Sequence, residues 1–417
     1  MNIHTVAVTA IFVSASLRAA EPAATPLSTL VEEATRNNPD VLAARRAWQA
    51  ATQIPSQVST LPDPEVTVQQ FSVGSPRPFA GYSNSGFAYI GFGISQQLPY
   101  PGKLKLKGEA AERESGATRQ RYEAMVRSVG EQVKEAYFDL AYAQQTLTVL
   151  NRNDQFLNDI EKIAEARYRV GQGNQQDVLK AQLERTKLLR EVARYRQTAD
   201  TEQAQIKKLL NRPIESAEIV AQPLTETPLN YTSDELVAKV RTNNPNVAGQ
   251  QEMVERQSLQ VEMARKDRYP DFNVQYMWQH TSEQYRDYYM LTFSARLPIY
   301  RKRKLDPEMT QAVEELNSSR REYESQVQST YFGVRDQYIA AETAAQVLKI
   351  YREGLIPQAL ATYRAGLAAY EAGKQDFQTL LGSFLDVLNF DEEYWKALAD
   401  HETALARLEQ FTGTPLN

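Results

Sequence analysis

Two hydrophobic patterns alternate along the chain and predict two kinds of structure. From residue 126, apolar or small residues recur at spacings of three and four: Val126, Val129, Val133, Ala136, Leu140, Ala143, Leu147 and Leu150. This period of 3.5 residues is typical of α-helices that pack as coiled coils. A second series runs from Val313 to Leu348, and a less regular one lies within 178–209. The pattern therefore predicts helices packed side by side.

The spacing of the prolines permits these helices to be very long. No proline occurs between Pro101 and Pro213, and only Pro357 interrupts the stretch from Pro307 to Pro415. Proline breaks helix interiors, so its absence leaves room for many uninterrupted turns. We predict helices over about 103–170, 174–211, 304–371 and 375–412.

Four other segments alternate apolar and polar residues and are predicted to be β-strands. They cover about 64–73, 87–98, 271–281 and 288–298. A period of two gives each strand one apolar and one polar face, and about ten residues is also the length that a tilted strand needs to cross a bilayer. Aromatic residues near the strand ends resemble an interfacial girdle: Phe71, Phe79, Tyr82, Phe87, Tyr285, Tyr288 and Tyr300.

Four strands cannot close a barrel, and a lipid bilayer does not tolerate open strand edges. If these strands span a membrane, several chains must therefore share one barrel, and three chains would supply twelve strands. A soluble β-sandwich attached to coiled coils is the alternative interpretation of the strands taken alone.

The same features occur twice in the same order. The motif at 37–39 (Asn-Asn-Pro) recurs at 243–245, an offset of 206 (243 − 37). Further matched pairs follow in order: Pro62-Asp63 with Pro270-Asp271, Leu98-Pro99 with Leu297-Pro298, Tyr137-Phe138 with Tyr331-Phe332, and Tyr168-x-x-Gly171 with Tyr370-x-x-Gly373. This order indicates a tandem duplication. We divide the chain into a first repeat at 21–213, a linker at 214–232 and a second repeat at 233–417.

Residues 1–20 are expected to be a secretory signal peptide. The run from Val6 to Leu17 is mostly apolar, and Ala19-Ala20 follows it. A disordered or helical N-terminal tail is the alternative.

Composition excludes several classes of protein. The chain has no cysteine, which rules out disulfide scaffolds, thiolate metal sites and cysteine nucleophiles. Its 47 basic and 52 acidic residues give a net charge of −5, which provides no basic footprint for nucleic acid. Mean hydropathy is −0.53, and no apolar stretch after residue 20 is long enough for a membrane-spanning helix. This criterion does not detect β-strands with alternating residues, because their polar residues lower the average hydropathy of the segment.

Nothing in the sequence points to catalysis. The three histidines, His4, His280 and His401, are far apart in the sequence, and no metalloprotease, P-loop or Cys/His metal motif is present. The acidic run at 391–393 is typical of a helix surface. We predict no enzyme, no cofactor and no metal site.

Taken together, the residues resemble the TolC family of outer-membrane efflux proteins over essentially the whole chain after the signal. The resemblance rests on the duplicated order of strand hairpin and long helices, the two Asn-Asn-Pro motifs and the two Tyr-x-x-Gly motifs. The segment 95–103 (Ser-Gln-Gln-Leu-Pro-Tyr-Pro-Gly-Lys) resembles the heavy-metal efflux subgroup, which is CusC/CzcC-like.

This resemblance implies a mainly α-helical fold with a membrane β-barrel part. Three chains would form a 12-stranded barrel in the outer membrane, continuous with a helical cylinder in the periplasm. The protein would be a passive duct that carries metal ions or small toxic molecules. Its implied partners are two further copies of itself, a periplasmic adaptor, an inner-membrane pump of the RND type, and outer-membrane lipid.

The resemblance also implies a set of site residues at the periplasmic tip. The expected adaptor contacts are Tyr168, Gly171, Gly173, Tyr370 and Gly373. Asp177 matches a family position that links neighbouring helices, with Tyr370 as its hydrogen-bond partner.

The expected gate departs from the family pattern in this sequence. Gln375 stands where the family has arginine, and the acidic rings fall on Thr379 and Gly382. The acidic ring is therefore expected at Asp376 or Asp386, although a solvated helix residue is the alternative for each.

Two other functions fit the same pattern. One is an outer-membrane duct for type I secretion of polypeptides, which shares the fold. The other is a coiled-coil scaffold of the cell envelope that forms no channel.

Overall fold

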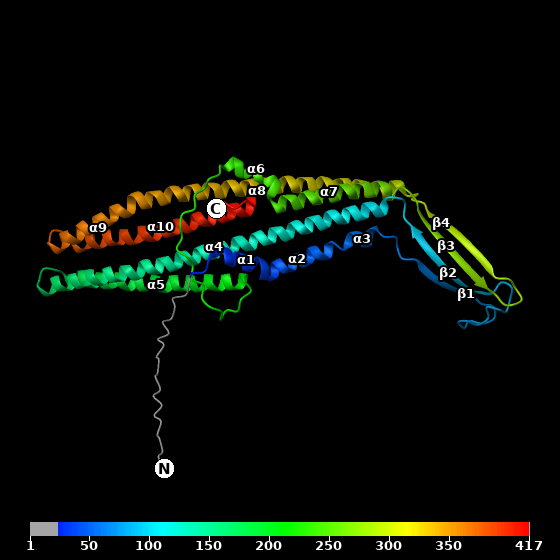
Figure 1. The fold of residues 1–417 in the computed structure, drawn as a ribbon, viewed down its shortest axis with the longest axis horizontal. Coiled ribbons are helices and arrows are strands. Elements are labelled where there is room, and N and C mark those ends of the chain that lie inside the picture. Colours follow the sequence, from blue (N-terminus) through cyan, green and yellow to red (C-terminus); the bar gives the residue numbers. More distant parts are fainter. Residues whose placement is uncertain (1–23, 417) are drawn as a thin grey trace, which may run out of the picture.

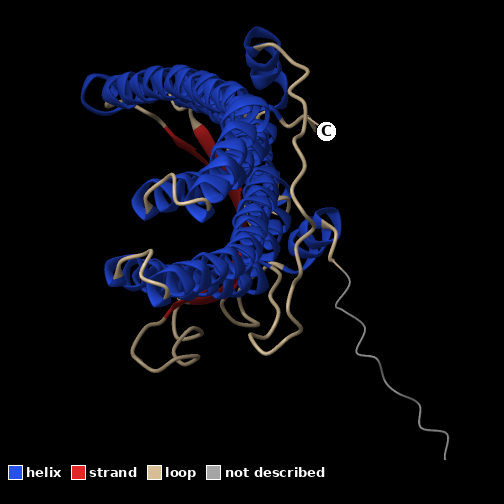
Figure 2. Ribbon diagram, turned by 90° about the vertical axis from the view of Figure 1, so that its left-hand side faces the viewer, coloured by secondary structure: helices blue, strands red, loops and turns tan. Residues whose placement is uncertain are grey.

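The computed structural model describes residues 24–416, so the expected signal peptide at 1–20 lies outside the described residues. The protein is a long helical shaft with a four-stranded sheet at one end (Figure 1). Seen along the shaft, the helices form one curved layer with a concave and a convex side (Figure 2). Short helices and connecting segments lie on the convex side.

Each repeat contributes short helices, a strand hairpin and long helices. The first repeat contains α1 (Leu27–Asn37), α2 (Pro39–Ala51), α3 (Ile54–Ser59), β1 (Glu65–Phe71), β2 (Tyr89–Leu98), α4 (Lys103–Arg169) and α5 (Gln175–Leu209). The second contains α6 (Ser233–Asn243), α7 (Pro245–Lys266), β3 (Asp271–His280), β4 (Tyr288–Arg296), η1 (Arg301–Leu305), α8 (Asp306–Ile350), η2 (Tyr351–Leu355), α9 (Ile356–Glu371) and α10 (Phe377–Thr412).

Two features differ from the sequence-based expectation. Helices precede the strands in both repeats, at 27–59 and 233–266, where no strand or helix was predicted. The helix expected over 304–371 is also broken by the π-helical turn η2. Pro357 lies in the first turn of α9, and a proline ring clashes with the carbonyl four residues earlier. The wider turn at Tyr351–Leu355 accommodates that proline without ending the helical path.

Apolar seams hold the helical layer together. Near the free end of the shaft, α4 and α5 pack with α9 and α10 around a core that includes Leu157, Ile160, Leu188 and Phe384. Closer to the middle, each repeat has its own core under its first short helix. Leu30 of α1 lies in one of these cores and Leu236 of α6 in the other.

The duplicated Asn-Asn-Pro motif has the same function in both repeats. Asn38 caps α2, because its Oδ1 accepts hydrogen bonds from the backbone N–H groups of Asp40 (2.9 Å) and Val41 (3.3 Å). Its Nδ2 donates to the carbonyl of Leu209 at the end of α5, at 3.0 Å. Asn244 caps α7 in the same way, and its Nδ2 donates to the carbonyl of Phe411 at 2.9 Å. One buried amide thus starts a short helix and anchors it to the end of a long one.

Replacing Asn38 by alanine should lower the free energy of unfolding. The variant loses a helix cap, worth about 1 kcal/mol, and leaves the Leu209 carbonyl without its donor, at a further cost of about 1–3 kcal/mol. Thermal unfolding monitored by circular dichroism measures the loss. Asn37→Ala is the matched control, since Asn37 is exposed and its side chain makes no hydrogen bond among the described residues. Equal melting temperatures for Asn38→Ala and the control would contradict this role.

Candidate functional site

The sheet has one continuous apolar face. Its strands are antiparallel in the order β1-β2-β3-β4, and their register aligns apolar residues across them. Phe92, for example, lies opposite Val68 on one side and Trp278 on the other. The residues on this face are mostly apolar and exposed: Val66, Val68, Phe92, Ile94, Phe272, Tyr276, Tyr289, Leu291 and Phe293. Such a face is suited to contact with lipid.

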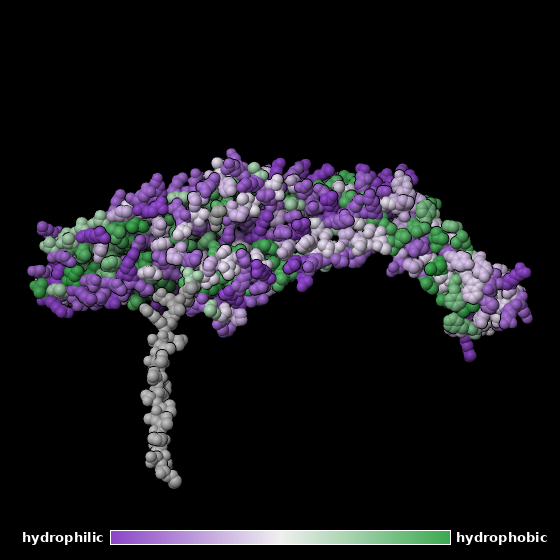
Figure 3. Space-filling model, in the orientation of Figure 1, coloured by the Kyte–Doolittle hydropathy of each residue, from purple (hydrophilic) through white to green (hydrophobic). Residues whose placement is uncertain are grey.

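The opposite face of the sheet is mainly polar. It carries Thr67, Gln69, Ser95, Gln97, Asn273, Gln275, Gln279, Thr292 and Ser294. Gly91 and Gly93 leave room on this face for the Met277 side chain, which is buried. Hydrophobic colour gathers over the strands, and polar colour covers the hairpin end and much of the shaft (Figure 3). Among residues 24–416, no helix has both the length and the apolar composition needed to cross a membrane.

An ion-pair cluster joins the base of the sheet to the shaft. Lys103, at the start of α4, contacts Asp271 at 3.0 Å and Asp267 at 3.1 Å. The same Asp271 accepts a hydrogen bond from the backbone N–H of Tyr100 at 2.8 Å. The Tyr100 ring stacks on Tyr269 with centroids 4.5 Å apart. The end of β2 is thereby fixed against the beginning of β3.

At the other end of the shaft, two loops form the tip: residues 170–174, between α4 and α5, and residues 372–376, between α9 and α10. Both preceding helices end in the same way, with Gly171 and Gly373 in the left-handed conformation at φ +71°. The N–H after each glycine bonds back to the carbonyl five residues earlier, Gln172 to Arg167 at 2.8 Å and Lys374 to Ala369 at 2.9 Å. This is a Schellman cap, which glycine permits because it has no Cβ.

Arg167 links the two tip loops. Its guanidinium lies over the Tyr370 ring, 4.7 Å from the ring centroid. It donates hydrogen bonds to the carbonyl of Tyr370 and to that of Gln172. Tyr370 is almost fully buried and packs edge-on against Phe377. Burial, together with the negative charge of Asp177, raises the pKa of the Tyr370 hydroxyl.

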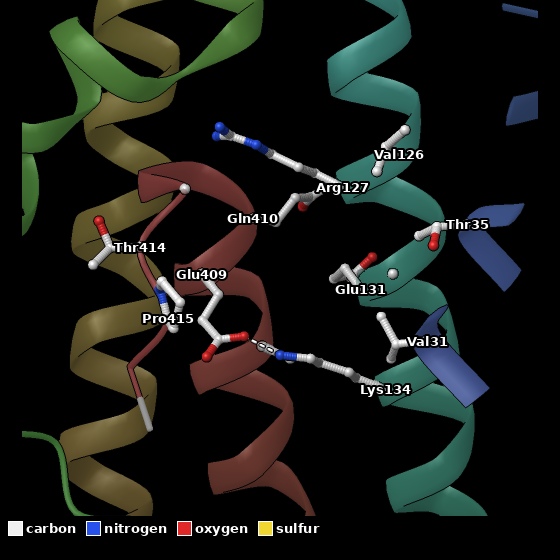
Figure 4. Close-up of a pocket in the computed structure, with 13 residues that line it drawn as sticks. Val31, Thr35, Val126, Arg127, Glu131, Lys134, Glu409, Gln410, Thr414 and Pro415 are labelled. Carbon is white, nitrogen blue, oxygen red and sulfur yellow. Dashed lines mark hydrogen bonds and ion pairs between the residues drawn. The ribbon is translucent and has the colours of Figure 1, made fainter. Parts of the chain in front are cut away.

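A second charged cluster lies near the middle of the shaft, where α1, α4 and the end of α10 enclose a cavity of about 360 Å³ (Figure 4). Lys134 of α4 pairs there with Glu409 of α10. Glu131 also lines the cavity and faces Arg407 at 3.6 Å, while Arg407 contacts Glu135 at 2.7 Å. Burial, and then the neighbouring charge of Glu135, raises the pKa of Glu131 to about 7. These contacts join the first repeat to the second.

The two histidines in the described part of the chain have structural partners. His280 lies at the end of β3 and bonds Asp287 at 2.7 Å. His401 is buried in α10, and its ring nitrogens lie 3.0 Å from the carbonyl of Ala341 and 2.8 Å from that of Thr227. Over residues 24–416, no three His, Cys, Asp or Glu side chains lie close enough together to hold a metal ion.

The sequence matches a known family in both repeats. The family is described as outer membrane efflux protein, and the matched residues are 30–212 and 236–414. The chain belongs to this family. Membership places the protein in the outer membrane as an efflux channel of the TolC type, with its helices extending into the periplasm. The resemblance found from the sequence is thereby confirmed.

Solved channels share the fold. VceC of Vibrio cholerae matches with a TM-score of 0.80 and 16% identity, over 94% of this chain and 97% of that one. CusC matches with a TM-score of 0.79 and 14% identity, over 94% and 92%. MtrE of Neisseria gonorrhoeae, in an open state, matches with 0.78 and 18%, over 94% and 89%. No curated protein gives a significant sequence match.

Within this efflux protein, the structure brings most of the predicted tip residues together. Gly171, Gly173, Asp177, Tyr370, Gln375 and Asp376 line one cavity of about 450 Å³. Tyr168 is exposed, unlike its counterpart Tyr370. The hydrogen bond expected between Tyr370 and Asp177 is not formed, since the buried Tyr370 hydroxyl has no partner in the described chain.

The two acidic gate candidates lie in different settings. Asp376 is the N-cap of α10 and accepts hydrogen bonds from the backbone N–H (3.0 Å) and the hydroxyl (2.7 Å) of Thr379. Asp386 lies almost three turns further along α10, is exposed and makes no hydrogen bond or ion pair among residues 24–416. It shares an exposed stripe with Thr379 and Gly382, at spacings of three and four.

Arg167, the residue that joins the two loops, was not predicted from the sequence. A signal was present in the repeat itself, because Arg167 precedes Tyr168 whereas Ala369 precedes Tyr370. The two repeats therefore differ at an otherwise matched position, and the structure shows that the arginine contacts the other repeat.

Replacing Arg167 by alanine should loosen the tip. Hydrogen bonds from a charged group are worth about 1.5–3 kcal/mol, so amide exchange at 166–178 and 368–378 should become about tenfold faster or more. Hydrogen–deuterium exchange with mass spectrometry measures this. Arg169→Ala is the control, because exposed Arg169 makes only an i, i+4 ion pair with Glu165. Unchanged exchange in Arg167→Ala would show that the two loops are held by other contacts.

The cluster around Glu131 should make stability depend on pH. The pKa of Glu131 is raised from 4.5 to about 7 in the folded chain. Protonated Glu131 therefore contributes to the free energy of unfolding at low pH. This contribution is lost as pH rises from about 4.5 to 7, because the unfolded chain binds fewer protons than the folded chain in that range. Glu131→Gln should melt at a higher temperature than the parent at pH 8 and lose less stability between pH 5 and pH 8. Glu112→Gln, an exposed change on α4, is the control. Identical pH profiles for Glu131→Gln and the parent would refute the prediction.

Proposed function

We propose that this protein is the outer-membrane duct of a tripartite efflux system and acts as a homotrimer. Its tip would dock to a periplasmic adaptor driven by an inner-membrane pump of the RND type. The observation that carries the proposal is the sheet, with one apolar face, one polar face and two edges that have no partner strand in the described chain. Unpaired edges are not tolerated in a bilayer, so the sheet needs further copies to complete it.

Over residues 24–416, the helical layer also has two edges with no helix packed against them, which supports the same assembly. On one edge, α5 exposes Leu179, Leu183 and Leu189 to solvent. On the other, α8 exposes Phe332, Ile339 and Ile350. Burying both edges against neighbouring copies would close the curved layer into a tube in line with the barrel.

The domain division at 213 and 232 and the tip assignment belong to this proposal. We assign adaptor docking to the tip residues Tyr168, Gly171, Gly173, Tyr370 and Gly373, at the end of the shaft opposite the strands. We assign the gate to Asp177, Gln375 and Asp386. Asp386 is the acidic residue of this set on the exposed stripe of α10, whereas Asp376 is used as a helix cap.

The proposed cargo is metal ions or small toxic molecules, and the duct transports them without chemistry. Resemblance of residues 95–103 to the heavy-metal subgroup supports this choice. In the structure, that segment forms the end of β2 and the lysine that binds Asp271. The segment that carries the resemblance therefore has a structural role at the base of the sheet.

Assembly and export test the proposal separately. Purified from membranes in detergent, the protein should be trimeric by native mass spectrometry, and a stable monomer would overturn the assembly. In cells that lack their own duct but carry the cognate pump and adaptor, it should restore resistance to heavy-metal salts. Trimers that restore polypeptide secretion instead would favour type I secretion.

A further inference from the structure

We infer how one copy of this chain joins the next at the sheet. β4 of one copy pairs with β1 of the next in a single register that sets Arg296 opposite Glu65, and Lys302 forms an ion pair with Asp63 at the base of this junction. The inference rests on the proposed trimer and goes beyond it by naming the residues that specify the contact.

The first step is that the two strand hairpins are equivalent residue by residue. Asp63 corresponds to Asp271 (271 − 63 = 208), and Leu98 corresponds to Leu297 (297 − 98 = 199). With these offsets, the pair Glu65–Ser95 of the first hairpin becomes Asn273–Ser294 of the second. That pair occurs in the structure, so the sequence repeat and the strand register agree.

The second step uses the junction between the hairpins, where β2 pairs with β3. This junction joins the end of one hairpin to the beginning of the next, which is what β4 and β1 must do between copies. Gln97 lies opposite Asn273 there. The same offsets turn this pair into Arg296 opposite Glu65 of the next copy.

The third step is that the resulting neighbours are chemically matched. On the apolar face, the pair Ile94–Tyr276 becomes Phe293 opposite Val68. On the polar face, Ser95–Gln275 becomes Ser294 opposite Thr67. A shift of one residue would place apolar side chains opposite polar ones. A shift of two would set Glu65 opposite Ser294 or Pro298, neither of which is charged.

The fourth step concerns the ion pair below the strands. Lys103 lies five residues after Leu98 and binds Asp271. The equivalent positions across the copies are Lys302 and Asp63. Both are exposed in the single chain, and neither has an ion-pair partner among residues 24–416. The neighbours Arg301, Arg303 and Lys304 are also exposed and unpaired there, so a basic strand end would meet an acidic one.

The register also gives a reasonable barrel. From Glu65 the line perpendicular to the strands passes through Ser95, Gln275 and Thr292. It then reaches Gln69 of the next copy, an advance of four residues (69 − 65). Three copies give a stagger of twelve residues over twelve strands. With about 3.3 Å per residue and about 4.8 Å between strands, the tilt is about 35°, within the usual range for barrels.

Cysteine cross-linking tests the register, because the natural chain contains no cysteine. The double variant Glu65→Cys with Arg296→Cys should form covalent trimers on mild oxidation, seen on denaturing gels without reductant. Gln97→Cys with Asn273→Cys is the matched control, since it has the same geometry but should close within one chain. Glu65→Cys with Ser294→Cys is the off-register control and should cross-link far less.

The outcomes separate the two proposals. Trimers that cross-link through the off-register pair, and not through 65 and 296, would overturn the register and leave the trimeric duct intact. Absence of trimers in the unmodified protein would overturn the proposed assembly itself.

Charge exchange tests the ion pair independently. Lys302→Glu should reduce the yield of heat-resistant trimers, and so should Asp63→Lys. The combination of both changes should restore the yield. Failure of the double variant to recover, with cross-linking at 65 and 296 retained, would remove the Lys302–Asp63 contact from the inference.

Discussion

The need to pair every backbone group of the sheet is the constraint on which the rest of the structure depends. In a bilayer, a free strand edge has no water to satisfy its N–H and C=O groups. The chain supplies four strands with an apolar face, and the outer edges of β1 and β4 have no partner strand within the described residues. In the proposed trimer, neighbouring copies complete the ladder, so the number of copies, the tilt of the strands and the closure of the helical layer all depend on this one requirement.

Duplication lets a single set of contacts be used more than once. The Asn38 and Asn244 caps are the same device in two repeats, and each anchors a short helix to the end of a long one. The two repeats differ from each other at the tip. Tyr168 is exposed, whereas Tyr370 is buried beneath Arg167, which has alanine as its counterpart. The repeats are alike where the shaft and sheet must be continuous and differ where the two hairpins have to hold each other.

Much of this fold could be predicted from the sequence because its elements are periodic. The strand faces and the long helices follow from residue spacing alone. The register of the strands in the structure keeps the predicted apolar residues on one face of the sheet. Most of the helices at 27–59 and 233–266 were missed because they are too short to establish a clear period. α7 has 22 residues but buries only Pro245, Val247 and Val261, so it has no regular apolar stripe. η2 was missed because its wider turn is a local response to Pro357. The role of Arg167 depends on a contact between two helices, which spacing along one helix cannot reveal. The cap formed by Asp376 is a local contact to Thr379, three residues further on, and the sequence signal for it was overlooked.

The tip loops owe their shape to backbone hydrogen bonds and to a left-handed glycine in each. The exposed side chains of Gln172, Asn174 and Lys374 take no part in these bonds. Their chemistry can therefore change by mutation while the outline of the loop stays the same. The backbone shape of the tip and the chemistry of its surface therefore depend on different residues. Related chains could diverge in what they recognise without a change in the fold of the tip.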